Sequence, residues 1–125
     1  MASPNIVAVT AIYGTTTYLI PSDTSANVLL SNGAGSNKVF KVNQIVVANV
    51  DGTNAVNTTV TINSAAAGGG TAYPIASTIS VPADASLIVT DKTTGFYLME
   101  NQSVVVTSGT ASKLAYTISY EDITS

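Results

Sequence analysis

Apolar and polar residues alternate along several short segments of the chain. The clearest case lies near the C-terminal end, where Leu114, Tyr116, Ile118 and Tyr120 are separated by small or polar residues. Alternation with a period of two is the pattern of a β-strand that buries one face. No segment carries a sustained apolar stripe with the 3.6-residue period and the capping box of a helix. The pattern therefore predicts an all-β protein.

Turns rich in glycine, asparagine and aspartate separate the alternating segments. Glycine supplies positive φ angles, and Asn or Asp side chains bond to the local backbone, so each cluster has a physical reason to turn. Many short strands joined by such turns predict a single antiparallel β-sandwich or jelly-roll-like domain of about eight to nine strands. The expected strands are near residues 5–12, 16–20, 26–31, 38–49, 57–63, 74–80, 85–90, 97–106 and 113–121.

The longest expected strand, 38–49, is apolar on both faces. Such a strand is either central in a sheet or covered by a partner. We therefore predict a subunit interface along it. The alternation predicts that Phe40, Val42, Val46, Ala48 and Val50 share one face, and that the interface candidates Val39, Ile45 and Val47 share the other.

The 125 residues contain no linker or repeat that would justify a second domain, so residues 1–125 are predicted to form one domain. Residues 1–5 are a candidate N-terminal arm. The stretch 65–70 consists of three alanines and three glycines and predicts a flexible loop between two strands. Gly68, Gly69 and Gly70 of this loop are the second group of candidate interface residues.

Charged residues make up 9% of the chain, against about 25% in ordinary globular proteins. Threonine, serine and asparagine take over the polar role and account for about a third of the residues. A neutral polar surface suits a protein packed against neighbours in an assembly, because burying a neutral group costs less than burying a charge. It also suits a secreted or merely β-rich domain, since threonine is a good strand residue.

The charge balance and the missing residue types exclude several functions. The net charge is −3, with four lysines and no arginine, which argues against nucleic acid as a partner. The absence of cysteine and histidine removes disulfides, thiolate chemistry and histidine-based triads. No run approaches the roughly 18 apolar residues of a membrane span, and the first residues lack the basic region of a secretion signal. We expect no membrane contact, and a product retained or assembled in the cell that makes it.

The carboxylates are the remaining candidates for chemistry. Asp84, Asp91 and Glu100 could in principle supply a glycosidase pair, but the sequence has no tryptophan and few aromatic platforms for a sugar. Asp84 follows a proline in VPADASLIV and Glu100 stands in a polar corner between two apolar runs, so both are predicted to be turn residues. The segment 51–54, DGTN, lacks the closing glutamate of a calcium loop and is predicted to be a hairpin or Asx turn. No catalytic, cofactor-binding or metal-binding residue is predicted.

Three segments carry a family resemblance: VANVDGTNAVNTTVTI, YPIASTISVPADASLIV and GFYLMENQSVVVTSGTASKLAYTISYEDI. Their order over about residues 38–123 is similar to that in small β-sandwich virion proteins of tailed bacteriophages, particularly those of marine cyanobacterial phages. The resemblance rests on the strand and corner pattern and brings no catalytic residues with it. It implies a non-enzymatic structural role.

Within that resemblance we expect a capsid decoration or cement protein. It would bind the major capsid protein or other virion proteins on the capsid surface, after assembly in the host cytoplasm, and form a homo-oligomer. One alternative is a neck, tail or fibre-base subunit. Another is a carbohydrate-binding or adhesin module, which would group exposed tyrosines, such as Tyr73 and Tyr97, on one face.

Overall fold

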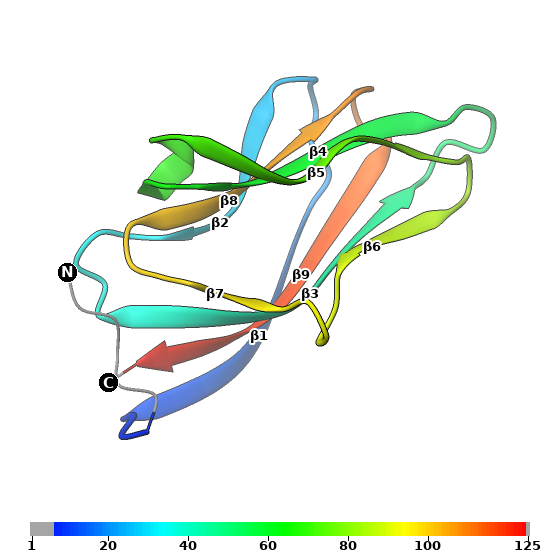
Figure 1. The fold of residues 1–125 in the computed structure, drawn as a ribbon. Coiled ribbons are helices and arrows are strands. Elements are labelled where there is room, and N and C mark those ends of the chain that lie inside the picture. Colours follow the sequence, from blue (N-terminus) through cyan, green and yellow to red (C-terminus); the bar gives the residue numbers. More distant parts are fainter. Residues whose placement is uncertain (1–6, 125) are drawn as a thin grey trace.

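The computed structural model describes residues 7–124, which form two antiparallel β-sheets packed face to face (Figure 1). The predicted all-β sandwich is thereby confirmed. Sheet A contains, in spatial order, β1 (Ala11–Leu19), β9 (Leu114–Thr124), β3 (Lys38–Asn49) and β6 (Ser86–Thr90), and β7 (Phe96–Leu98) also pairs with β3. Sheet B contains β2 (Ala26–Asn32), β8 (Gln102–Ser108), β4 (Val56–Asn63) and β5 (Ala72–Val81), and the 3-10 turn η1 (Ala66–Gly68) lies between β4 and β5.

The first strand pairs with the last strand, the second with the second-to-last, and the pairing continues in this order towards the middle of the chain. β1 pairs with β9, β2 with β8, β3 with β6 and β7, and β4 with β5. This nested pairing, divided over a five-stranded and a four-stranded layer, is the arrangement of a jelly roll. Its outermost pair joins Ala11 to Thr124, so residues at opposite ends of the sequence lie side by side.

The space between the sheets is filled by the inward rows that the alternation predicts. On β9, Leu114, Tyr116 and Ile118 are fully buried and Tyr120 is 9% exposed. The hydroxyl of Tyr116 bonds to the side chain of Thr58 and donates to the carbonyl oxygen of Thr107 at 3.2 Å, so this buried polar group is paired. Burial raises the pKa of Tyr116.

A β-bulge in β3 changes which of its apolar residues share a face. The register with β9 shifts between Val42 and Gln44, which leaves Asn43 as an extra residue. One extra residue reverses which face of the sheet the following side chains reach. Phe40 and Val42 therefore point into the core before the bulge, and Ile45 and Val47 point into the same core after it. The core-facing row of β3 therefore changes parity at the bulge, while Val39, next to Phe40, is buried on the other side of the strand.

Two strand boundaries differ from the expected ones. Residues 11–19 form the single strand β1 where two strands, 5–12 and 16–20, were expected, because Gly14 pairs with Glu121 inside the strand and makes no turn. Residues 7–10 precede that strand, and residues 5 and 6 lie outside the described part of the chain. The expected strand 97–106 is divided into β7 and β8 by a turn in which Asn101 has φ of 58°.

Candidate interaction surface

The interface residues predicted on the long strand are used by the fold itself. Ile45 and Val47 are fully buried in the core between the sheets. Val39 is 3% exposed and is paired across the strands with Ile123. These three side chains are therefore unavailable as a docking surface in the folded chain, and the bulge at Asn43 is the physical reason for Ile45 and Val47.

The glycine loop folds over the outer side of sheet B. Gly68 and Gly69 are half-buried and Gly70 is exposed. A Cβ atom added to Gly68 would lie 3.3 Å from Val28 and 3.6 Å from Val105, which shows how closely the loop covers these two valines. The loop is thus a cover for apolar residues of β2 and β8.

Hydrogen bonds from three other segments tie this loop down, in contrast to the flexible loop that its composition predicts. The backbone amides of Ala66, Ala67 and Gly68 donate in turn to side-chain oxygens of Asn101, Ser31 and Ser103 at 3.1, 2.9 and 2.9 Å, respectively. Side chains from β2, β8 and the β7–β8 turn therefore satisfy three consecutive amides. Their positions in the sequence give no sign of this.

Two of the carboxylates that could have formed a catalytic pair, Asp84 and Glu100, lie far apart. Asp84 stands in the turn that leads into β6, and Glu100 in the turn that follows β7, at opposite ends of the sandwich (Figure 1). β6 reaches β3 at Ala48 and β7 reaches it at Phe40, a separation of roughly 26 Å along the strand. Glycosidase carboxylates are about 5–9.5 Å apart. Asp84 and Glu100 cannot act as such a pair.

Hydrogen bonds of backbone amides hold the turns at Asp84 and Asp51. Asp84 has φ of 57° and donates its amide to the carbonyl oxygen of Asp51 at 3.1 Å. The carboxylate of Asp51 accepts the amides of Thr53 at 2.8 Å and Asn54 at 3.1 Å, which is the predicted Asx turn. These amides hold the pKa of Asp51 below its usual value. Within residues 7–124 no group of three or more metal-ligating side chains is found.

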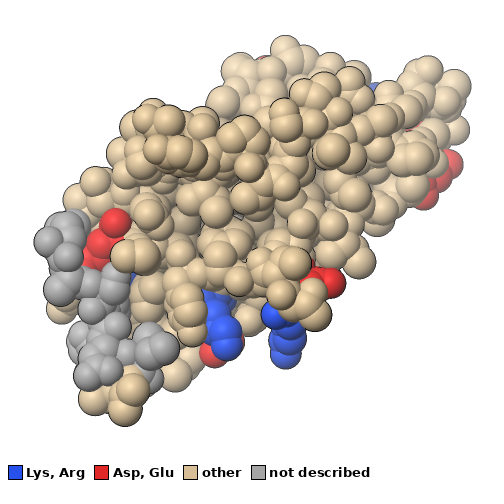
Figure 2. All heavy atoms as spheres, viewed as in Figure 1, with Lys and Arg blue, Asp and Glu red and all other residues tan. Residues whose placement is uncertain are grey.

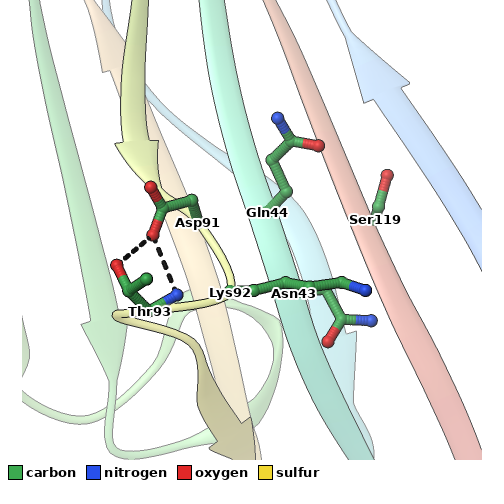
Figure 3. Close-up of a pocket in the computed structure, with 6 residues that line it drawn as sticks. All are labelled: Asn43, Gln44, Asp91, Lys92, Thr93 and Ser119. Carbon is green, nitrogen blue, oxygen red and sulfur yellow. Dashed lines mark hydrogen bonds between the residues drawn. The ribbon is translucent and has the colours of Figure 1, made fainter.

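A polar pocket of about 480 Å³ lies where the outer side of sheet A meets the β6–β7 loop (Figure 3). The carboxylate of Asp91 is held by Thr93, whose amide donates at 2.9 Å and whose hydroxyl donates at 2.5 Å. The lining can hydrogen-bond to a polar group but contains no aromatic ring on which a sugar could stack. It consists of Asn43, Gln44, Asp91, Lys92, Thr93 and Ser119.

A row of outward side chains beside this pocket crosses all four main strands of sheet A. Tyr18 pairs with Thr117, Thr117 with Val46, and Val46 with Ile88. Tyr18 is 78% and Ile88 58% exposed. The neighbouring outward row consists of Ala115, Ala48 and Ser86.

We call these seven residues the neutral face, because none of them carries a charge. Neutral residues also cover most of the surface in Figure 2, where charged side chains form a few small groups. The alternation predicted that Val46 shares a face with Phe40. The bulge at Asn43 instead places Val46 on the outward side, opposite to Phe40. The outward position of Ile88 was implicit in its alternation with Leu87 and Val89.

The two tyrosines expected to group on one face of a glycan-binding module are divided between the two sheets. Tyr73 belongs to β5 of sheet B, and Tyr97 to β7 of sheet A. Tyr13 and Tyr18 lie on β1, but their odd spacing places them on opposite sides of the sheet. Sequence spacing could not show this separation of Tyr73 from Tyr97, because it depends on which sheet each strand joins.

The fold defines the class of protein as a small jelly-roll-type β-sandwich. No protein-family model matches the sequence, and no curated protein matches it significantly. Among solved structures, a chain from Bacillus endospore appendages, described as disulfide-linked pili, is similar with a TM-score of 0.50 and 16% identity over 92% of this chain and 88% of that chain.

A second similar structure is a chain from the acid-stable capsid of Helicobacter pylori bacteriophage KHP30, with a TM-score of 0.51 and 10% identity. The match covers 93% of this chain and 90% of that chain, so the two chains are of nearly equal length. At this level of identity the likeness concerns the fold.

Within the part of the chain that the structure describes, no helix is long and apolar enough to cross a membrane.

Proposed function

We propose that this chain is a non-enzymatic structural subunit of a bacteriophage particle, and that it decorates the capsid by binding the major capsid protein. The observation that carries the proposal is the neutral face, an exposed sheet surface with Tyr18 and Ile88 at its two ends. The likeness in fold and length to a phage capsid chain supports it. A fold alone does not define a function, so the proposal depends on this surface.

The neutral face would act by burying apolar area. Removing apolar surface from water contributes about 25 cal/mol per Å². The hydroxyl of Thr117 adds a hydrogen-bonding group without the desolvation cost of a charge. Because a capsid offers many equivalent positions, a modest contact at each one adds up to a substantial stabilisation of the shell.

The likeness to the pilus chain does not favour a pilus function here. That structure is described as disulfide-linked, and the present sequence contains no cysteine. Copies of this chain cannot be joined by disulfides, so any assembly that they form is held by non-covalent contacts.

The number of copies in purified virions tests the proposed position. We expect hundreds of copies, comparable in number to the major capsid protein. Six or twelve copies would instead indicate a ring in the neck or tail, and absence from virions would contradict a virion function altogether. Electron microscopy of the same particles should place the density on the outer capsid surface.

A matched pair of variants tests the surface. Capsids lacking this chain are mixed with Ile88→Glu, which puts a charge on the neutral face, or with Ser77→Glu, which puts it on the exposed strand β5 of the other sheet. We expect Ile88→Glu to lose binding at least tenfold and Ser77→Glu to bind as the unmodified protein does. Equal binding by both variants, or capsids that keep their full strength without the protein, would refute the decoration role.

A further inference from the structure

The outer edge of β1 is an unpaired strand edge. β1 pairs with β9 through nine consecutive residues on one side. On its other side, no strand of residues 7–124 pairs with it, and Figure 1 shows β1 at the margin of sheet A. An edge strand presents N–H and C=O groups that can extend the sheet with a strand from another molecule.

The other sheet edges carry features that discourage such pairing. Proteins protect edges with proline, charge, bulges or short strands. β5 contains Pro74, a residue with positive φ at Thr78, and two register shifts with β4. β2 has a register shift at Leu29. β6 and β7 are five and three residues long.

β1 has none of these protective features. Its nine residues, AIYGTTTYL, include no proline and no charged side chain, and its register with β9 is unbroken. It also exposes apolar side chains on both sides of the sheet. Ile12 is 51%, Tyr13 64% and Tyr18 78% exposed. An edge of this kind is suited to a partner strand.

We propose that the partner is β1 of a second copy of this chain, paired antiparallel about a two-fold axis at Thr15. Two identical strands pair antiparallel with the same surface on both copies, and a strand without charges places no like charges opposite one another. With the axis at Thr15, Ile12 of each copy lies opposite Tyr18 of the other. Aromatic and β-branched residues form favourable cross-strand pairs, so this register contains two of them.

The pairing would make sheet A continuous through both copies. Because the two-fold axis is perpendicular to the sheet, both neutral faces would lie on the same side of the dimer. A capsid-binding surface would thereby be doubled, and two linked contacts bind more tightly than one. The pairing itself does not depend on the capsid role.

Substituting Thr15 with residues of opposite charge tests whether two copies pair through β1 and whether Thr15 lies at the two-fold axis. Thr15→Lys places two ammonium groups opposite each other in the dimer, and Thr15→Glu places two carboxylates there. We expect the unmodified chain to form a concentration-dependent dimer in sedimentation velocity, and each variant alone to be monomeric. An equimolar mixture of the two variants should recover the dimer, since it pairs a cation with an anion, and this recovery also shows that both variants fold.

The corresponding variants Ser77→Lys and Ser77→Glu, on the β5 edge, are the controls and should dimerise as the unmodified chain does. A monomer at all concentrations, a dimer that Thr15→Lys leaves intact, or a mixture that stays monomeric would overturn the proposal. All these measurements use the isolated chain, so they are independent of whether it binds capsids.

A cysteine provides a second test. The chain has no cysteine of its own, so Thr15→Cys introduces a single thiol at the proposed two-fold axis. Directly opposite residues of antiparallel strands have Cα atoms about 4.5–5.5 Å apart, within the range of a disulfide. Mild oxidation should convert Thr15→Cys into a covalent dimer much faster than Ser77→Cys. Equal rates for the two variants would contradict pairing through β1.

Discussion

At the scale of single residues, buried amide side chains hold the loops of this sandwich. Asn49 is 3% exposed, and its amide donates to the carbonyl oxygens of Asn54 and Val81, each at 2.9 Å. Its side-chain oxygen accepts the amide of Asp51 at 2.9 Å. One side chain thus joins the end of β3, the following turn and the end of β5.

Asn49→Ala should lower the free energy of unfolding by about 2–3 kcal/mol, because it leaves buried polar groups without partners. Chemical denaturation measures the change. Asn57→Ala, at an exposed position, is the matched control and should cost less than about 0.5 kcal/mol. Equal losses in the two variants would show that the bonds of Asn49 contribute nothing particular.

The acidic turns predict how stability depends on pH. Amides of Thr53 and Asn54 lower the pKa of Asp51, and the hydroxyl and the amide of Thr93 lower the pKa of Asp91. A lowered folded-state pKa contributes stability above the unfolded value of about 4, and this contribution is lost as the pH falls through the folded value. The denaturation midpoint should therefore fall below about pH 4. Asp51→Asn keeps an acceptor oxygen without titrating, so its midpoint should depend less on pH, and an unchanged dependence would contradict the assignment.

At the scale of elements, the bulge at Asn43 keeps both halves of β3 directed into the core. Deleting Asn43 would turn Ile45 and Val47 towards solvent, or Phe40 and Val42 if the other half kept its place. We expect the deletion variant to lose cooperative thermal unfolding. Deletion of Thr24, in the exposed β1–β2 loop, is the control and should leave a cooperative transition. A folded deletion variant of near-normal stability would show that the register can slip.

The conformation of the glycine loop can be tested at Gly70. Its φ is 68°, and an added Cβ would lie 2.3 Å from the side-chain oxygen of Ser64 and 2.9 Å from the amide nitrogen of Ala65. Gly70→Ala should cost about 1–3 kcal/mol through backbone strain and displacement of Ser64. Gly33→Ala meets no atom within 4 Å and should be nearly neutral in the same denaturation experiment.

The positions of strands and turns were easier to predict from the sequence than the pairing of the strands and the contacts of the loops. The inward row of β9 follows from alternation, and the turns at Asp51 and Asp84 follow from their glycine and proline neighbours. The bulge could not be found in this way, because Asn43 suits either face and only the pairing with β9 shows it as the extra residue. For the same reason, alternation placed Ile45 and Val47 on the opposite face from Val42, although all three side chains lie in the core. The cover over β2 and β8 depends on side chains distant in the sequence, which periodicity cannot detect.

At the scale of the whole molecule, the scarcity of charge predicts how binding responds to salt. Screening weakens contacts between exposed charges and has little effect on apolar burial. Binding to capsids through the neutral face should therefore change less than about twofold between low and high sodium chloride, measured by the copies retained per particle. Release of most copies at high salt would indicate an interface dominated by charged side chains.

The nested pairing of the strands also constrains when the chain can fold. β9 lies between β1 and β3, and its pairing with β1 extends to Ala11 and Thr124. During synthesis, β1 and β3 cannot pair with β9, the strand between them, until residues 114–124 have left the ribosome. Contacts between residues so distant in sequence are slow to form. Sheet A is therefore completed only after translation of its last strand, and a chain that ends before β9 has two strands exposed to aggregation.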